Sequence, residues 1–172
     1  MRKTILLLIL IFFMCAVPGM AQTAELITEI LEKEIATYMD FSYLIASEAG
    51  LEITPFEAYS WCTQFNSFPS DDPANTPITV KRFSHFVMQN YGLKGGIMWT
   101  AFKSPRYAWK ELKSAGFWDH KIDPDKKLTG KEMTQAIGRF FLFYPEARLR
   151  TVAMQDTAPA NREALLFIGE EK

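Results

Sequence analysis

Apolar residues recur at helical spacing in five segments of the chain, and signals that begin or end helices bound these segments. The first segment covers residues 24–49. The second begins at Thr54 and the fifth at Thr129, where a threonine is followed three residues later by a glutamate, so that each side chain caps the other's backbone. The third and fourth cover residues 79–92 and 104–116. No stretch alternates in the manner of a strand, so the sequence predicts an all-α fold.

The helix starts are spaced as in a tandem repeat. Thr79 and Thr129 are 50 residues apart, and Thr54 is separated by the same interval from Ser104. At this offset the apolar positions also coincide: Ala58, Cys62 and Phe65 fall on Ala108, Leu112 and Ala115. We therefore expect two related helix–loop–helix units plus an N-terminal helix that completes their core.

These units set the expected domain limits. The two units cover residues 54–91 and 104–144, inside one domain that spans residues 22–150. Residues 151–172 are expected to form a C-terminal tail that either docks back onto the helices or binds a partner.

The first 21 residues have the plan of a secretory signal peptide. Two basic residues precede an apolar run over residues 5–17, and Gly19 and Ala21 provide small residues for cleavage after residue 21. The run would extend about 20 Å as a helix, which is short of the ~30 Å hydrocarbon core of a bilayer. Cys15 lies inside this run and follows bulky residues, which does not resemble a lipidation site. The sequence predicts export to the periplasm or cell envelope of a bacterium, with no membrane span after cleavage.

Composition narrows the function further. The chain is 48% hydrophobic and carries a formal net charge of −1, so nothing indicates the concentrated positive charge that binds nucleic acid. Two cysteines and two histidines leave little material for thiol, metal or imidazole chemistry. Cys62 lies on an apolar stripe, which favours a small buried residue over a reactive thiol. We therefore expect a non-enzymatic binding module with no catalytic residue, no metal and no cofactor.

The second unit resembles an S-layer homology repeat. The residues that carry the likeness are Ala108, Gly116–Phe117, the Asp123–Pro124–Asp125 loop and the run from Leu128 to Met133. Thr129 and Glu132 match the first and last residues of the Thr-Arg-Ala-Glu signature of that family, with Lys131 between them. Val80 and Gly130 stand where the signature has arginine, and Arg82 stands where the first unit would have glutamate.

The resemblance implies a partner. Proteins with S-layer homology repeats bind cell-wall glycan and fasten proteins to the envelope, so it implies cell-wall glycan or another envelope protein, with Thr129, Lys131 and Glu132 among the binding residues. A weaker likeness, over residues 95–99 and 105–112, is to small exported proteins of spirochaetes.

The residues themselves point to a contact surface on the fourth helix and the loop that follows it. Aromatic rings with nearby cationic donors suit a sugar or peptide groove, because ring faces stack on apolar surfaces while charges orient the ligand. The candidate residues are Arg106, Tyr107, Trp109, Lys110 and Trp118. We expect Trp118 to lie across the surface beside this helix.

An alternative function uses a different cluster. Asp119, His120 and Asp123 form the densest group of possible metal ligands in the sequence and would serve a small periplasmic hydrolase or metal-dependent enzyme. Against this reading, aspartates beside a proline are common turn formers, and the loop lacks the glycine and glutamate of a calcium-binding EF-hand.

Overall fold

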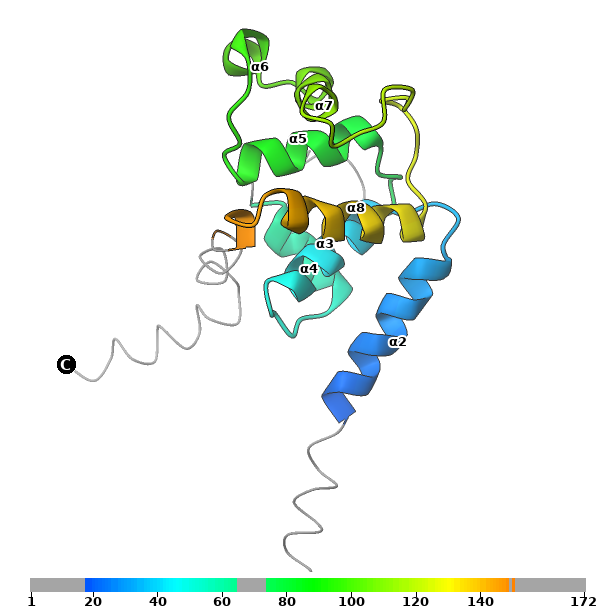
Figure 1. Cartoon of the computed structure of the whole chain (residues 1–172). Coiled ribbons are helices and arrows are strands. Elements are labelled where there is room, and N and C mark those ends of the chain that lie inside the picture. Colours follow the sequence, from blue (N-terminus) through cyan, green and yellow to red (C-terminus); the bar gives the residue numbers. More distant parts are fainter. Residues whose placement is uncertain (1–17, 65–73, 149, 151–172) are drawn as a thin grey trace, which may run out of the picture.

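The computed structural model of the chain describes residues 18–64, 74–148 and 150, and within them all regular structure is helical (Figure 1). The all-α prediction is confirmed. The helices are α2 (Pro18–Glu32), α3 (Tyr38–Glu48), α4 (Pro55–Cys62), α5 (Val80–Asn90), α6 (Ile97–Phe102), α7 (Pro105–Ser114) and α8 (Gly130–Phe143). Residues 1–17 of the predicted signal peptide and the predicted tail, 151–172, lie outside the described residues. Among the helices that are described, none combines the length and apolar character needed to cross a membrane.

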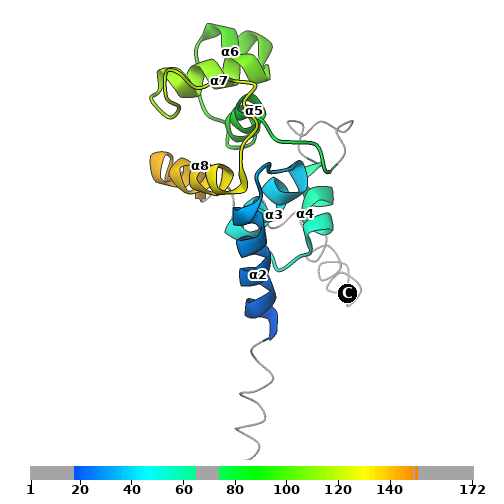
Figure 2. The same ribbon diagram turned by 90° about the vertical axis from the view of Figure 1, so that its right-hand side faces the viewer.

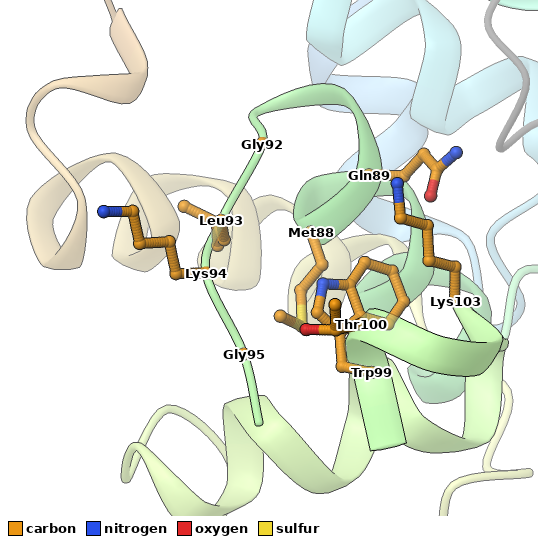
Figure 3. A pocket seen from close by; sticks show the side chains of 9 residues that line it. All are labelled: Met88, Gln89, Gly92, Leu93, Lys94, Gly95, Trp99, Thr100 and Lys103. Atoms are coloured by element: carbon orange, nitrogen blue, oxygen red, sulfur yellow. The ribbon is translucent and has the colours of Figure 1, made fainter. Parts of the chain in front are cut away.

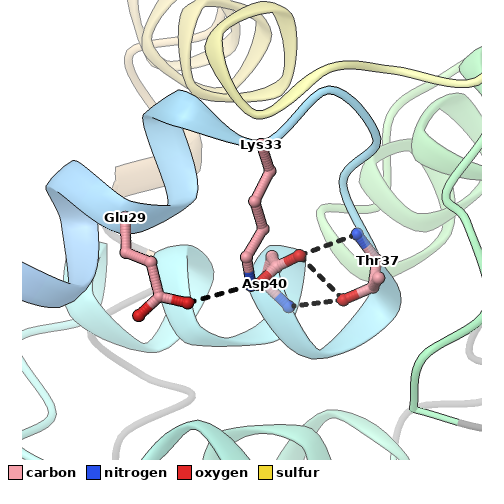
Figure 4. A network of polar contacts seen from close by, with 4 residues as sticks. All are labelled: Glu29, Lys33, Thr37 and Asp40. Carbon is pink, nitrogen blue, oxygen red and sulfur yellow. Dashed lines mark hydrogen bonds and ion pairs between the residues drawn. The ribbon is translucent and has the colours of Figure 1, made fainter.

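The N-terminal segment is two helices, and the prediction of one helix over residues 24–49 is wrong. After α2 ends, Thr37 caps α3 by accepting a hydrogen bond from the backbone of Asp40, and the Asp40 carboxylate accepts one from Thr37 N at 2.9 Å. Lys33 Nζ donates to the same carboxylate at 2.7 Å (Figure 4). These bonds make the break between α2 and α3 a defined corner.

The corner creates a third helix–loop–helix unit beside the two expected ones. The units are α2–α3, α4–α5 and α7–α8, and their second helices begin after Thr37, Thr79 and Thr129. The residues just before these threonines are joined in a closed ring of backbone hydrogen bonds. Ala36 N donates to Leu128 O at 2.8 Å, Leu128 N to Ile78 O at 3.0 Å, and Ile78 N to Ala36 O at 3.0 Å.

The helices around this ring pack between units. The second helix of each unit lies against the first helix of the next: α3 against α4, α5 against α7, and α8 against α2. In Figure 1 and in the perpendicular view of Figure 2, α8 and α5 accordingly lie between α6–α7 on one side and α2–α4 on the other. The two predicted units therefore do not form the core alone, because α2 and α3 close the circle.

The core is filled largely by aromatic side chains. Phe41 packs edge-on against Phe83 and Phe86, with ring centroids 5.6 and 4.9 Å apart. The predicted apolar stripes are confirmed where Ala58, Cys62, Ala108 and Leu112 are buried. Ala115, the third apolar position that the repeat aligned on this helix, is exposed because it is the C-cap of α7, beyond the last turn that packs on α5. Phe65 lies outside the described residues.

Candidate functional site

The predicted contact residues of α7 lie as the helical spacing indicates. Arg106 and Lys110 are exposed, while Tyr107 and Trp109 are half-buried at the margins. Lys110 Nζ lies 5.5 Å from the centre of the Tyr107 ring, and Lys113 Nζ lies 4.7 Å from the Trp109 ring. The indole N–H of Trp109 is enclosed and has no acceptor among the described residues. This side of α7 therefore presents cations supported by aromatic rings.

Trp118 does not belong to that surface, and the prediction that it is exposed is wrong. Its side chain is 6% exposed, and its indole N–H donates to Ser84 Oγ in α5 at 2.8 Å. Ser84 in turn donates to Val80 O at 2.7 Å, so the hydroxyl group serves both as donor and as acceptor. The ring also packs edge-on against Phe117 and Phe83. Trp118 is core because the residue before it, Phe117, brings the chain inward at once after α7.

The three residues suggested by the family resemblance are at the start of α8. Thr129 and Glu132 form the predicted capping box, with Glu132 N donating to Thr129 Oγ1 at 3.1 Å. Lys126 Nζ bonds the Glu132 carboxylate at 2.5 Å, which, together with the backbone bond from Thr129, lowers the pKa of Glu132 against the opposing effect of burial. Lys131 is exposed. Glu132 and Trp118 line one small pocket of about 160 Å³, and no predicted α7 residue lines it, so the eight candidates do not form one site.

The residues of the alternative enzyme are engaged in turns. Asp119 Oδ1 accepts from Lys121 N at 2.7 Å, and Asp123 Oδ1 accepts from Asp125 N at 2.9 Å. These are the short-range side-chain bonds by which aspartate stabilises a turn. Within the described part of the chain, no group of three histidine, cysteine or acidic residues is arranged to hold a metal.

A groove that the sequence did not predict lies between the C-terminal end of α5 and α6. We call it the α5–α6 groove, and its volume is about 420 Å³ (Figure 3). Its walls are formed by Met88, Gln89, Gly92, Leu93, Lys94, Gly95, Trp99, Thr100 and Lys103. The volume is within the range of about 300–1,000 Å³ that is usual for small-molecule sites.

Backbone geometry shapes this groove. Gly92 turns the chain after α5 with a left-handed φ of 59°, and Gly95 leaves room for Trp99, whose Cδ1 would lie 2.7 Å from a Cβ at position 95. Lys103 ends α6 in the left-handed region at φ 42°, an uncommon conformation for a residue other than glycine. Its carbonyl accepts a hydrogen bond from His85 Nε2 at 2.8 Å, which fixes the turn against α5.

The groove offers unpaired polar groups. The side-chain oxygen of Gln89 is enclosed without a hydrogen-bond partner in the described structure. Lys94 and Lys103 are exposed, and neither takes part in an ion pair of the described residues. A buried polar atom without a partner costs about 1–3 kcal/mol, so a ligand hydroxyl that bonded Gln89 would recover that cost.

No protein-family model, no curated protein and no solved structure matches this chain.

Proposed function

We propose that this chain is an exported, non-enzymatic module of a bacterial cell envelope that binds cell-wall glycan in the α5–α6 groove. The observation that carries the proposal is the combination of an unpaired amide oxygen at Gln89 with two cations, Lys94 and Lys103, around one groove. Export is proposed from the basic and apolar pattern of residues 1–21.

The groove suits an acidic sugar. Glycan hydroxyls are donors that Gln89 Oε1 needs, and sugar carboxylates or phosphates are the anions that Lys94 and Lys103 can pair with. Thr100 Oγ1 donates to Gly96 O at 3.1 Å, which leaves its lone pairs for a further sugar hydroxyl. Met88, Leu93 and Trp99 add apolar surface for the faces of the ring.

The alternative enzyme gains no comparable support. The Asp119 and Asp123 carboxylates are committed to the turns of their loop, and His120 is exposed. Among the described residues, these aspartates already serve as turn acceptors, whereas the α5–α6 groove presents an amide oxygen without a partner.

The test is sedimentation of the purified chain with peptidoglycan sacculi. Gln89→Leu should weaken binding about tenfold while leaving the melting temperature unchanged or raised, because it removes both the ligand acceptor and the unpaired polar atom. Lys94→Ala and Lys103→Asn should weaken binding most at low salt, and their difference from the parent should shrink as added salt screens the lost attraction. Asparagine is chosen at position 103 because it tolerates the left-handed conformation.

Two controls complete this experiment. Lys131→Ala removes an exposed cation outside the groove and should bind as the parent does. Divalent metal ions are added separately while melting is followed. Stabilisation by metal together with no retention on sacculi would reverse the ranking of the two functions, and unchanged binding by Gln89→Leu and Lys94→Ala would remove the groove from the proposal.

A further inference from the structure

Helix α6 projects apolar side chains into solvent. It lies at one extremity of the molecule in both perpendicular views (Figures 1 and 2). Ile97 is 86% exposed, Phe102 is 63% exposed and Met98 is 45% exposed, although all three are large and apolar. Since Ala101 is exposed as well, these four residues form a continuous surface that we call the α6 outer face.

The α6 outer face is opposite the α5–α6 groove. At about 100° per residue, the four outer residues lie within one half of the helix circumference. The groove residues Trp99, Thr100 and Lys103 occupy the other half. Trp99 is buried there, with its ring edge-on to His85 at 6.0 Å. Trp99 therefore packs on α5 from one face of α6. On the opposite face Phe102 meets the Tyr107 ring of α7 and is still 63% exposed.

Cationic residues flank this face. The Tyr107 ring stacks on Phe102 at 5.6 Å, and Lys110 Nζ lies over Tyr107, so aromatic and charged groups follow one another from α6 onto α7. Arg106 is exposed beside them. Residues 94–113 contain five lysines and arginines (Lys94, Lys103, Arg106, Lys110 and Lys113) and one acid, Glu111, in a chain whose net charge is −1. Of these cations, Arg106 and Lys110 lie on the side of Phe102 and Tyr107 and place positive charge beside the α6 outer face, while Lys94 and Lys103 line the α5–α6 groove.

We propose that the α6 outer face inserts into the headgroup region of an anionic phospholipid bilayer, with Arg106 and Lys110 bound to lipid phosphates. Single side chains that project from a convex tip suit a fluid lipid surface, which closes around each of them. Apolar burial combined with cationic headgroup contacts is the physical basis of interfacial helix binding. The half-buried Tyr107, placed between apolar and charged groups, suits the boundary between acyl chains and headgroups.

The proposal does not depend on the glycan site. Because the groove and the outer face occupy opposite sides of α6, the chain would engage a bilayer and the cell wall at the same time. Gln89→Leu should then leave bilayer docking unchanged, and Phe102→Ser should leave retention on sacculi unchanged, so the failure of one proposal is distinguishable from the failure of the other.

The test is a local fluorescence measurement on the full chain. A polarity-sensitive dye is attached to Ala101→Cys, which keeps Ile97, Met98 and Phe102, in a Cys15→Ser background. Cys62 does not interfere, because burial raises the pKa of its thiol to about 12 despite a hydrogen bond with Ser42. The matched control carries the dye at Gln135→Cys, an exposed position on α8.

Vesicles of phosphatidylglycerol and phosphatidylcholine should shift the emission of the dye at position 101 to the blue and leave the dye at position 135 unchanged. Phe102→Ser should weaken the interaction about tenfold, and the paired change Arg106→Glu with Lys110→Glu should remove the preference over pure phosphatidylcholine. The substituted side chains are exposed, so circular dichroism should show unchanged melting.

Three results would overturn bilayer docking. These are the absence of a shift at position 101, an equal shift at position 135, and a charge-reversed variant that still prefers anionic vesicles over pure phosphatidylcholine. If no shift occurred at position 101, a protein partner would become the better explanation of the α6 outer face.

Discussion

Gly130, the first residue of α8, lies directly against the carbonyl oxygen of Ile30 in α2, where a Cβ would overlap that oxygen. The Gly130 amide donates to Lys33 O at 2.9 Å, so the contact is also part of the backbone pairing between units. Position 130 is where the sequence resemblance to the S-layer homology signature would place arginine. The close approach of α2 therefore requires glycine here and excludes the side chain that the signature would supply.

Substitution of Gly130 should be severely destabilising. Gly130→Ala forces α2 away from α8, and we expect it to lower the free energy of unfolding by about 2–3 kcal/mol. Gly138→Ala, in the same helix, is the matched control. A Cβ there meets no atom within 4 Å, so it should stabilise the chain by about 0.5–1 kcal/mol through helix propensity. Urea unfolding measures both values, and equal stability of the two variants would refute the described packing of α2.

The Asp40 carboxylate is a second sensitive position. It is almost fully buried and accepts hydrogen bonds from Lys33 Nζ and from the backbone and hydroxyl groups of Thr37. Asp40→Ala should cost about 2–3 kcal/mol, because it leaves several donors without an acceptor. Asp125→Ala removes the exposed ion pair with Lys81 and should cost less than about 1 kcal/mol. If thermal unfolding showed the two variants to be equally stable, the α2–α3 corner would not depend on this network.

Stability should fall in acid partly through the capping glutamates. The Lys126 ammonium lowers the pKa of Glu132 from its ordinary value of 4.5, and the backbone N–H of Thr54 lowers that of Glu57. Because the folded-state pKa is below the unfolded one, this stabilisation is fully present above pH 4.5 and is lost as the pH falls through the folded-state pKa.

The measurement is urea unfolding at a series of pH values below 6. Glu132→Gln and Glu57→Gln should each flatten the dependence of the unfolding free energy on pH in that range. The paired variant should flatten it most, since the two caps are on different helices. A slope that is unchanged in both single variants would contradict the assignment of the shifted groups.

Substitutions at Trp118 and Arg106 distinguish a residue of the core from a residue of the surface. Trp118→Ala should lower the unfolding free energy by about 3–5 kcal/mol, because it empties a large buried volume and leaves Ser84 without its indole donor. Arg106→Ala should change it by less than about 0.5 kcal/mol, because that side chain is exposed. Retention of both variants in the envelope fraction is measured and divided by the fraction of each protein that is folded. If folded Trp118→Ala were retained less than the parent, Trp118 would contribute to binding as well as to the core.

The sequence was most informative where a cap made a helix begin. Thr54 and Thr129 begin helices because hydroxyl and carboxylate groups three residues apart satisfy free amides, which is a local property. The break before α3 escaped prediction for the opposite reason. Ile35 continues the apolar spacing of α2 across the corner, yet it is 46% exposed. Thr37 and Asp40 are the signal that the sequence analysis missed. They form the same capping arrangement as Thr54 and Thr129, with aspartate in place of glutamate.

The candidate site depended on features that are not local. Lys103, which lines the α5–α6 groove, adopts a left-handed conformation and accepts a hydrogen bond from His85 in another helix, and neither feature is visible in residue spacing. The role of Gly95 beneath Trp99 likewise depends on the folded chain. Trp118 was misassigned because its partner, Ser84, is brought to it only by the packing of units.

The closed ring of Ala36, Ile78 and Leu128 forms only when three distant parts of the chain have come together. Each member needs both of the others, and these three residues are spread across most of the described sequence. Closing such long loops is entropically costly and is repaid only when the last partner arrives. If the chain is exported with its N-terminus first, as we propose, its core cannot be completed until the loop at Leu128 has left the pore, so the polypeptide can still be threaded for most of its transit.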